Sequence, residues 1–461
     1  MKDTYYFIAI GGIGMSGLAK YLAEAGFCVM GSDIKRNRNI DELEKLGAKI
    51  FIGHDENNLP EKCLVVASTA IKEDNPELIK VKKLGIEVLH RSDLLARINE
   101  GLVGEKKKYF IGFSGTHGKT TTSGLASYVL QKADLNPSFV VGGIVPEFGI
   151  NSNAGNGDFF VAELDESDGT IVKYVPEISV INNLEVDHMD FYTNGLQSIL
   201  DTFKVYLGKL PANAKVLLNN DDEGNLKLKE QNPQIKFITF GLNNADYVAK
   251  NISLGIETTF DVYHKDKFLV ALKTQMPGLH NVYNVLGVLT SLNETGVDVN
   301  AVKEHFYTFT GMGRRLQLAA KIDGITVYDD YAHHPTEIKA TLSALKLMGY
   351  KNIIAVFQPH RYTRLAGLWN EFLNSFSDAN KVFVTDVYAA SEDKIESADS
   401  SKFVEELLTN VPCEHLSGSI KELAGNLLPK LKSGDVVVGL GAGTITTLGK
   451  DLLFVKNEVK I

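Results

Sequence analysis

Short β-branched or aromatic runs alternate with helical patterns along almost all of the 461 residues. Residues 5–10, 108–115 and 351–359 are runs of this kind, and each precedes a helix-period pattern. Such runs are typical of strands buried on both faces of a parallel sheet, with helices as the crossover connections. The alternation therefore restricts the chain to the α/β class.

The signals fall into three blocks, which predict three tandem α/β domains. The first block, residues 1–105, ends in the polar linker pattern NEGLVGEKKK. The second block, residues 106–311, includes a strand-rich section at 247–276 that predicts an antiparallel extension. The third block, residues 312–461, follows a glycine hinge and returns to a doubly wound pattern.

The composition argues against several classes of function. The formal net charge is -9, so the chain has no bulk basic surface for nucleic acid or an anionic membrane. No run approaches the roughly 18 apolar residues of a membrane span, and the start lacks signal-peptide features. Three widely spaced cysteines fit a reducing compartment without a zinc site. We expect a cytoplasmic protein without membrane insertion, and the oligomeric state stays open.

A glycine-rich turn follows the first strand. The stretch IGGIGMSG contains G-x-G-x-x-G between a strand and a helix, and an aspartate ends the next strand. Such a turn brings backbone amides and a helix N-terminus to a diphosphate, and the acidic side chain takes sugar hydroxyls. The pattern predicts a Rossmann-like first domain that binds NAD(P) or a UDP-sugar. The expected contacts are Gly12, Ile13, Gly14, Ser16, Gly17 and Asp33.

A second loop, GTHGKTTT, joins a strand to a helix in the middle block. It ends like a phosphate-binding loop, but Phe113 replaces the first glycine of G-x-x-x-x-G-K-[ST] and argues against ordinary motor and switch NTPases. We expect Lys119, as an exposed loop side chain, to contact the terminal phosphates and Thr120 to offer its hydroxyl to Mg²⁺. The loop predicts a P-loop ATPase-like second domain.

Further metal ligands are expected at the ends of two later strands. Glu163 lies in VAELDESD and His188 in NNLEVDHMD. The carboxyl ends of central strands are where α/β sheets bind ligands. With Thr120, these side chains would supply the ligands of Mg²⁺.

Motifs in all three blocks resemble those of the Mur ligase family of peptidoglycan synthesis. They are IGGIGMSG, GTHGKTTT, DESDG, NNLEVDHMD, GMGRRL, YDDYAHHPTEI and QPHRYTR. In that family the loop reads GT[HN]GKT, which accounts for Phe113. The resemblance implies an ATP- and Mg²⁺-dependent ligase that joins L-alanine to the lactyl carboxylate of UDP-N-acetylmuramate through an acyl phosphate. It also implies a Rossmann-like third domain that brings the amino acid.

The resemblance assigns roles to particular residues. The ATP site would comprise Gly115, Thr116, His117, Gly118, Lys119, Thr120, Thr121, Asn281, Asn284, Arg315 and Asp330. The amino-acid side would comprise Tyr331, His333, Arg361 and Arg364, and the catalytic residues would be Lys119, His188 and Arg315. Two arginines three positions apart can present two forks to one carboxylate if the turn is helical.

One departure separates branches of the family. Several members carry a lysine, carbamylated in use, where this chain has Phe203, and the alanine-adding branch lacks that lysine. A register shift would let Lys204 replace it. The alternatives are a recycling member that attaches a whole tripeptide, a nicotinamide-dependent dehydrogenase, and an NTP-driven switch.

Overall fold

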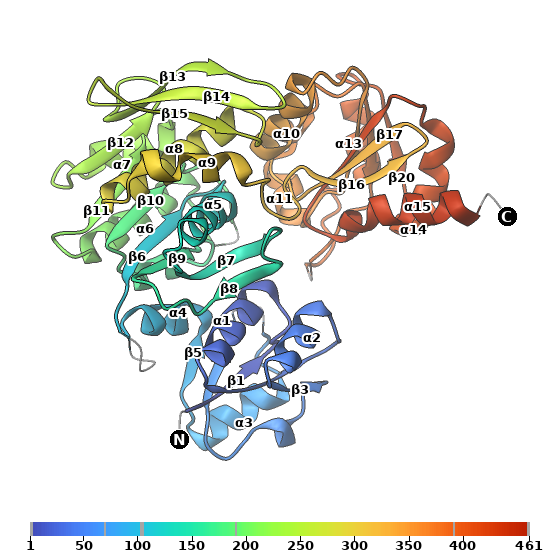
Figure 1. Cartoon of the computed structure of the whole chain (residues 1–461). Coiled ribbons are helices and arrows are strands. Elements are labelled where there is room, and N and C mark those ends of the chain that lie inside the picture. The colour runs from blue at the N-terminus through green and yellow to red at the C-terminus, as the bar shows by residue number, and fades with distance from the viewer. Residues whose placement is uncertain (1–2, 69–70, 102–105, 190, 391, 459–461) are drawn as a thin grey trace. The chain divides into compact units, whose positions relative to one another are not determined.

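The computed structural model describes residues 3–68, 71–101, 106–189, 191–390 and 392–458 (Figure 1). Residues 102–105 of the expected linker lie outside this part of the chain. The chain divides into two compact units. The first comprises Met1–Glu185, Ile199–Tyr247 and Gly287–His305, and the second Val186–Ser198, Val248–Leu286 and Phe306–Ile461.

The first unit begins with a parallel five-stranded sheet in the order β3-β2-β1-β4-β5. The strands are β1 (Thr4–Ile8), β2 (Cys28–Asp33), β3 (Lys49–Ile52), β4 (Leu64–Ala67) and β5 (Val88–His90). The helices are α1 (Ile13–Glu24), α2 (Arg38–Lys45), α3 (Pro76–Leu84) and α4 (Arg91–Asn99). Local sequence sets their ends: α3 starts after an Asn75 cap and stops at Gly85, whose φ is 64°.

The same unit contains a second, mainly parallel run of strands in the order β12-β11-β10-β6-β9-β7-β8. They are β6 (Tyr109–Ser114), β7 (Ser138–Val145), β8 (Ile150–Asn153), β9 (Phe159–Glu163), β10 (Ile178–Ile181), β11 (Lys215–Asn219) and β12 (Phe237–Gly241). Helix α5 (Lys119–Lys132) follows β6, and α6 (Leu196–Lys209) and α7 (Glu223–Gln231) follow later strands. The phosphate loop therefore lies at the carboxyl end of a central strand.

The expected antiparallel extension is present. It comprises β13 (Tyr247–Ser253), β14 (Thr258–His264) and β15 (Lys267–Thr274), and β14 pairs antiparallel with β15. Helices α8 (Leu279–Glu294) and α9 (Val299–Thr308) follow.

The second unit ends in a six-stranded sheet in the order β16-β17-β21-β18-β19-β20, parallel except for the β16–β17 pair. Its strands are β16 (Gln317–Ile322), β17 (Ile325–Asp330), β18 (Ile353–Phe357), β19 (Lys381–Thr385), β20 (Cys413–Leu416) and β21 (Val436–Leu440). Its helices are α10 (Pro335–Leu347), α11 (Tyr362–Gly367), α12 (Trp369–Leu373), α13 (Ser400–Leu407), α14 (Ile420–Leu427) and α15 (Leu448–Glu458).

Both faces of this sheet are buried. Val436 and Val438 pack into one apolar cluster and Val437 into another. Successive side chains of a strand point to opposite faces, so a continuous apolar run needs a cover on each. The predicted α/β class is confirmed.

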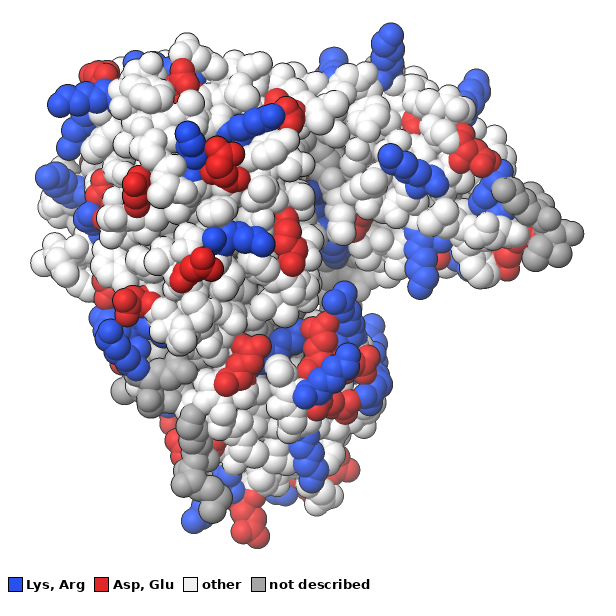
Figure 2. All heavy atoms as spheres, in the orientation of Figure 1, with Lys and Arg blue, Asp and Glu red and all other residues white. Residues whose placement is uncertain are grey.

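Among the described residues, no helix is long and apolar enough to cross a membrane. On the face shown in Figure 2, Lys and Arg are interspersed with Asp and Glu. That mixture agrees with the net charge of -9.

Candidate active site

The phosphate loop lies between β6 and α5. Gly115 (φ 119°) and Gly118 (φ 82°) have left-handed backbones that favour glycine. A Cβ at Gly115 would lie 2.8 Å from the carbonyl oxygen of Asn183, so no side chain fits there. The Thr116 amide donates to that carbonyl (2.9 Å), and the His117 amide donates to the Asn183 side-chain oxygen (2.8 Å). These bonds fix the loop at the N-terminus of α5, where the free helix amides can bind an anion.

The Lys119 side chain is largely buried, with 13 % exposed, so the expectation of an exposed lysine was wrong. Its Nζ donates to the carbonyls of Gly115 (2.6 Å) and Thr116 (3.1 Å) and to Glu166 Oε1 (2.7 Å). Burial raises the pKa of Glu166 to about 7, although Lys119 acts to lower it. Burial acts to lower the pKa of Lys119, but neighbouring carboxylates, Glu166 foremost, raise it overall. Lys119 is therefore a cation held by an acidic partner.

Two of the predicted magnesium ligands, Thr120 and Glu163, lie side by side. Thr120 Oγ1 donates to Glu163 Oε2 (2.9 Å), which also accepts from the Gly142 amide (2.9 Å). Hydroxyl and carboxylate oxygens are ligands that Mg²⁺ prefers, so this pair fits the cation. The third predicted ligand, His188, belongs to the second unit. Its φ is 52°, and its amide donates to Asp187 Oδ1 (2.7 Å).

The glycine-rich turn presents Gly12 and Ile13 to solvent, and Gly12 is the N-cap of α1. Asp33 is buried, and its Oδ2 accepts from the Gly11 amide (2.8 Å). Ser16 is also buried and donates to the Ile13 carbonyl (3.1 Å). In this structure the buried Asp33 and Ser16 side chains therefore stabilise the turn by hydrogen bonds to its backbone.

Residues of the middle block pack against the same turn. The Asn151 side-chain amide donates to the Ile13 carbonyl (3.0 Å), and a Cβ at Gly17 would lie 3.0 Å from that nitrogen. The Ala154 amide donates to Glu24 Oε2 (2.9 Å). The glycine-rich turn and the strand β8 thus belong to one compact unit.

In the second unit, three predicted residues gather beside α10. The Arg315 guanidinium lies 5.3 Å from the centroid of the Tyr331 ring and 3.3 Å from Glu337 Oε1. The His333 amide donates to Glu337 Oε2 (3.0 Å). Burial lowers the pKa of His333 to about 3, so its ring is neutral. His334 is the N-cap of α10, and Pro335 takes the first helical position.

The other residues of this unit that were predicted to contact ATP, Asp330, Asn281 and Asn284, form hydrogen bonds within the unit. Asp330 accepts from the amides of Leu316 (2.7 Å) and Ala332 (2.8 Å), and burial raises its pKa to about 6. In α8, the Asn284 side-chain amide donates to Asn281 Oδ1 (3.0 Å). The residues proposed for ATP are thus divided, with the loop in the first unit and these side chains in the second.

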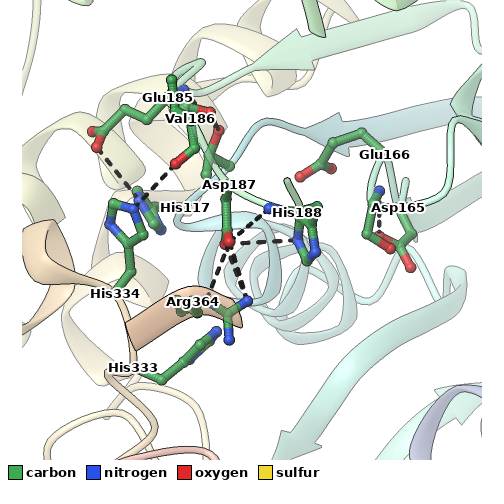
Figure 3. Close-up of polar contacts among 12 residues, drawn as sticks. His117, Asp165, Glu166, Glu185, Val186, Asp187, His188, His333, His334 and Arg364 are labelled. Carbon is green, nitrogen blue, oxygen red and sulfur yellow. Dashed lines mark hydrogen bonds and ion pairs between the residues drawn. The ribbon is translucent and has the colours of Figure 1, made fainter. Parts of the chain in front are cut away.

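The two candidate arginines for the amino acid differ in their surroundings. Arg364 is 6 % exposed, and its Nη2 lies 3.1 Å from Asp187 Oδ1, toward which it points in Figure 3. Arg361 is 33 % exposed, has φ 67°, and lies 3.7 Å from Glu392 Oε1. A carboxylate of the chain itself therefore occupies the Arg364 fork.

Asp187 and Glu166 are the residues that the sequence reasoning missed. Both stand inside motifs that it used, NNLEVDHMD and DESDG. Asp187 directly precedes the predicted ligand His188, and Glu166 lies three positions after the predicted ligand Glu163. An acidic residue near a predicted ligand was the available signal. In α6, Phe203 is fully buried and Lys204 is exposed.

Three models of one family match the chain in order. They are the Mur ligase family catalytic domain over residues 4–101, the Mur ligase middle domain over 113–292, and the Mur ligase glutamate ligase domain over 314–443. The chain belongs to the Mur ligase family.

Its full-length relatives point to one branch. The chain is 39 % identical to a UDP-N-acetylmuramate–L-alanine ligase of Geobacter sulfurreducens, covering 99 % of this chain and 98 % of the relative. It is also 39 % identical to the ligase of that name from Clostridium novyi, with 99 % of each covered. The crystal structure of a UDP-N-acetylmuramate–alanine ligase from Thermotoga maritima matches with a TM-score of 0.83 and 28 % identity, covering 99 % of both chains. The predicted fold of three tandem α/β domains is confirmed by this match.

Proposed function

We propose that this chain is an ATP-dependent ligase that joins L-alanine to the lactyl carboxylate of UDP-N-acetylmuramate, releasing ADP and phosphate. The observation that carries the proposal is the full-length similarity to relatives of that name at 39 % identity. The phosphate loop in its family form, with Phe113 in place of the first glycine, supports it. We place the reaction in the cytoplasm, as a step of peptidoglycan synthesis.

In the proposed reaction, the lactyl carboxylate attacks the γ-phosphate of ATP, and the amine of alanine then displaces phosphate from the acyl phosphate. Phosphoryl transfer needs positioning and charge neutralisation more than covalent help. Lys119, at the N-terminus of α5, donates to Glu166 in this structure. With ATP bound, it would release Glu166 and contact the terminal phosphates instead. Thr120, Glu163 and His188 would hold Mg²⁺, which neutralises phosphate charge when bound.

The remaining substrate sites follow the proposed domains, residues 1–105, 106–311 and 312–461. The turn at Gly12 and Gly14 would hold the diphosphate of the UDP-sugar through backbone amides. Asn281, Asn284, Arg315 and Asp330 would complete the ATP site, with Arg315 also catalytic. Tyr331, His333, Arg361 and Arg364 would line the alanine site. For Arg364 this requires that the alanine carboxylate share a guanidinium that Asp187 already contacts.

Phosphate release tests the proposal directly. With ATP, Mg²⁺ and UDP-N-acetylmuramate present, we expect phosphate release to depend on an added amino acid and to be fastest with L-alanine. The panel should include glycine, L-serine and the tripeptide that the recycling branch attaches. Release only with the tripeptide would favour that branch, and release without the UDP-sugar would favour an NTP-driven switch. Reduction of NAD(P) would favour a dehydrogenase.

A further inference from the structure

Arg91 joins the glycine-rich turn to the acidic segment after β9. It is the first residue of α4, and its Nη2 forms an ion pair with Asp165. A Cβ at Gly14 would lie 3.2 Å from Arg91 Nη1, so the guanidinium lies directly against the turn. A guanidinium has five N–H donors in a planar fork, and one carboxylate does not use them all.

Asp165 forms an ion pair with Arg91, and its Oδ1 accepts from the Ser167 amide (3.1 Å). The next residue, Glu166, accepts from Lys119 Nζ (2.7 Å). Asp165 and Glu166 thus contact one cation at the glycine-rich turn, Arg91, and another at the phosphate loop, Lys119.

Contacts other than the Arg91 ion pair also fix the start of α4. Lys173 Nζ lies 2.7 Å from Asp93 Oδ1. His90 and Asp93 also form the capping box of the helix. The helix therefore has anchors that do not involve Arg91, and loss of the arginine side chain alone should leave it in place.

We propose that Arg91 is a substrate-binding residue whose guanidinium binds the diphosphate of the UDP-sugar at Gly14, while Asp165 holds the fork in position. The inference rests on the proposed function, which puts a UDP-sugar at this turn. Backbone amides at a helix N-terminus carry only partial charge, and an arginine fork adds a full charge with matched geometry. Asp165 is a positioning residue in this arrangement.

Calorimetric titration of UDP into the full chain tests the role. Arg91→Ala should weaken UDP binding about 10- to 100-fold, because a charge-assisted contact is lost. Uridine, which has no phosphate, should bind the wild type and Arg91→Ala equally. In steady state, the KM for UDP-N-acetylmuramate should rise while those for ATP and alanine stay within about two-fold. Arg91→Lys keeps the charge but loses the fork, so its UDP affinity should lie between those of the wild type and Arg91→Ala. This variant replaces Arg91→Ala in the test if the alanine variant does not fold.

Two controls separate binding from a merely structural role. Arg97 lies on the same helix and pairs with the exposed Glu87, so Arg97→Ala should bind UDP like the wild type. Asp165→Asn keeps the Arg91 cation but weakens the contact that positions its fork, so it should lose less UDP affinity than Arg91→Ala. If Asp165→Asn loses UDP as strongly as Arg91→Ala, the pair only docks α4 and the inference is wrong. If the wild type binds UDP and Arg91→Ala binds it with equal affinity, the inference is also wrong. If the wild type itself binds no UDP, the proposed function is wrong.

Discussion

Replacing Lys119 with alanine should reduce turnover about 100- to 1,000-fold, because the lysine would neutralise charge on the phosphoryl group in transfer. The fold should survive near neutral pH. The pKa of Glu166 is already raised to about 7, so without Lys119 its buried carboxyl can take up a proton instead of staying charged. The measurement is kcat together with the melting temperature at pH 6 and pH 8.

The pH dependence of that variant has a definite sign. A carboxyl whose folded pKa lies above its unfolded value favours folding most at low pH, and this contribution is lost as pH rises. Lys119→Ala removes the charge that lowers the pKa of Glu166, so it should lose more stability at pH 8 than at pH 6. Lys132→Ala, at the other end of α5, is the matched control and should keep wild-type activity. Activity of Lys119→Ala within a few-fold of the wild type would contradict the assigned role.

Replacing Arg364 with alanine should lower the free energy of unfolding by about 3–5 kcal/mol, the usual cost of leaving one partner of a buried ion pair uncompensated. Arg364 and Asp187 are 6 % and 8 % exposed. Arg361→Ala is the matched control on the same segment. Because Arg361 is 33 % exposed and 3.7 Å from its acidic partner, that change should cost less than about 1 kcal/mol. Denaturant unfolding measures both.

A second substitution and a pH series test the cause. Arg364→Ala combined with Asp187→Asn should recover part of the loss, because no unpaired charge then remains buried. Burial acts to raise the pKa of Asp187, but Arg364 holds it well below its usual range. The contribution of this ion pair to the free energy of unfolding should be complete above about pH 4, the pKa of aspartate in an unfolded chain. It should shrink as pH falls further. A loss of stability independent of the Asp187 charge would show that Arg364 acts through packing alone.

Local patterns predicted the fold well because its signals are local. The apolar run at Val436–Leu440 needs burial on both faces, and the Gly-Lys-Thr ending needs a strand before it and a helix after it. The sequence therefore indicated the sheets and the phosphate loop without any knowledge of tertiary contacts.

The charge pairs could not be predicted in the same way. Lys119 is covered by Glu166, 47 positions away, and Arg364 meets Asp187 across 177 positions. No local pattern encodes such a meeting, because it depends on which strand ends the topology brings together. For this reason the local pattern predicts an exposed Lys119 and an Arg364 that faces a substrate carboxylate, whereas both side chains contact carboxylates of the chain itself.

In the proposed reaction, the lactyl carboxylate itself attacks the γ-phosphate. If it does, one carboxylate oxygen must leave in inorganic phosphate, because the amine breaks the bond from carbon to oxygen in the second step. The measurement uses UDP-N-acetylmuramate labelled with heavy oxygen in the lactyl carboxylate, and reads the phosphate by mass spectrometry. We predict one labelled oxygen per phosphate when the carboxylate is fully labelled. Unlabelled phosphate that acquires heavy oxygen only from labelled water would contradict the proposed reaction, because water would then be the nucleophile.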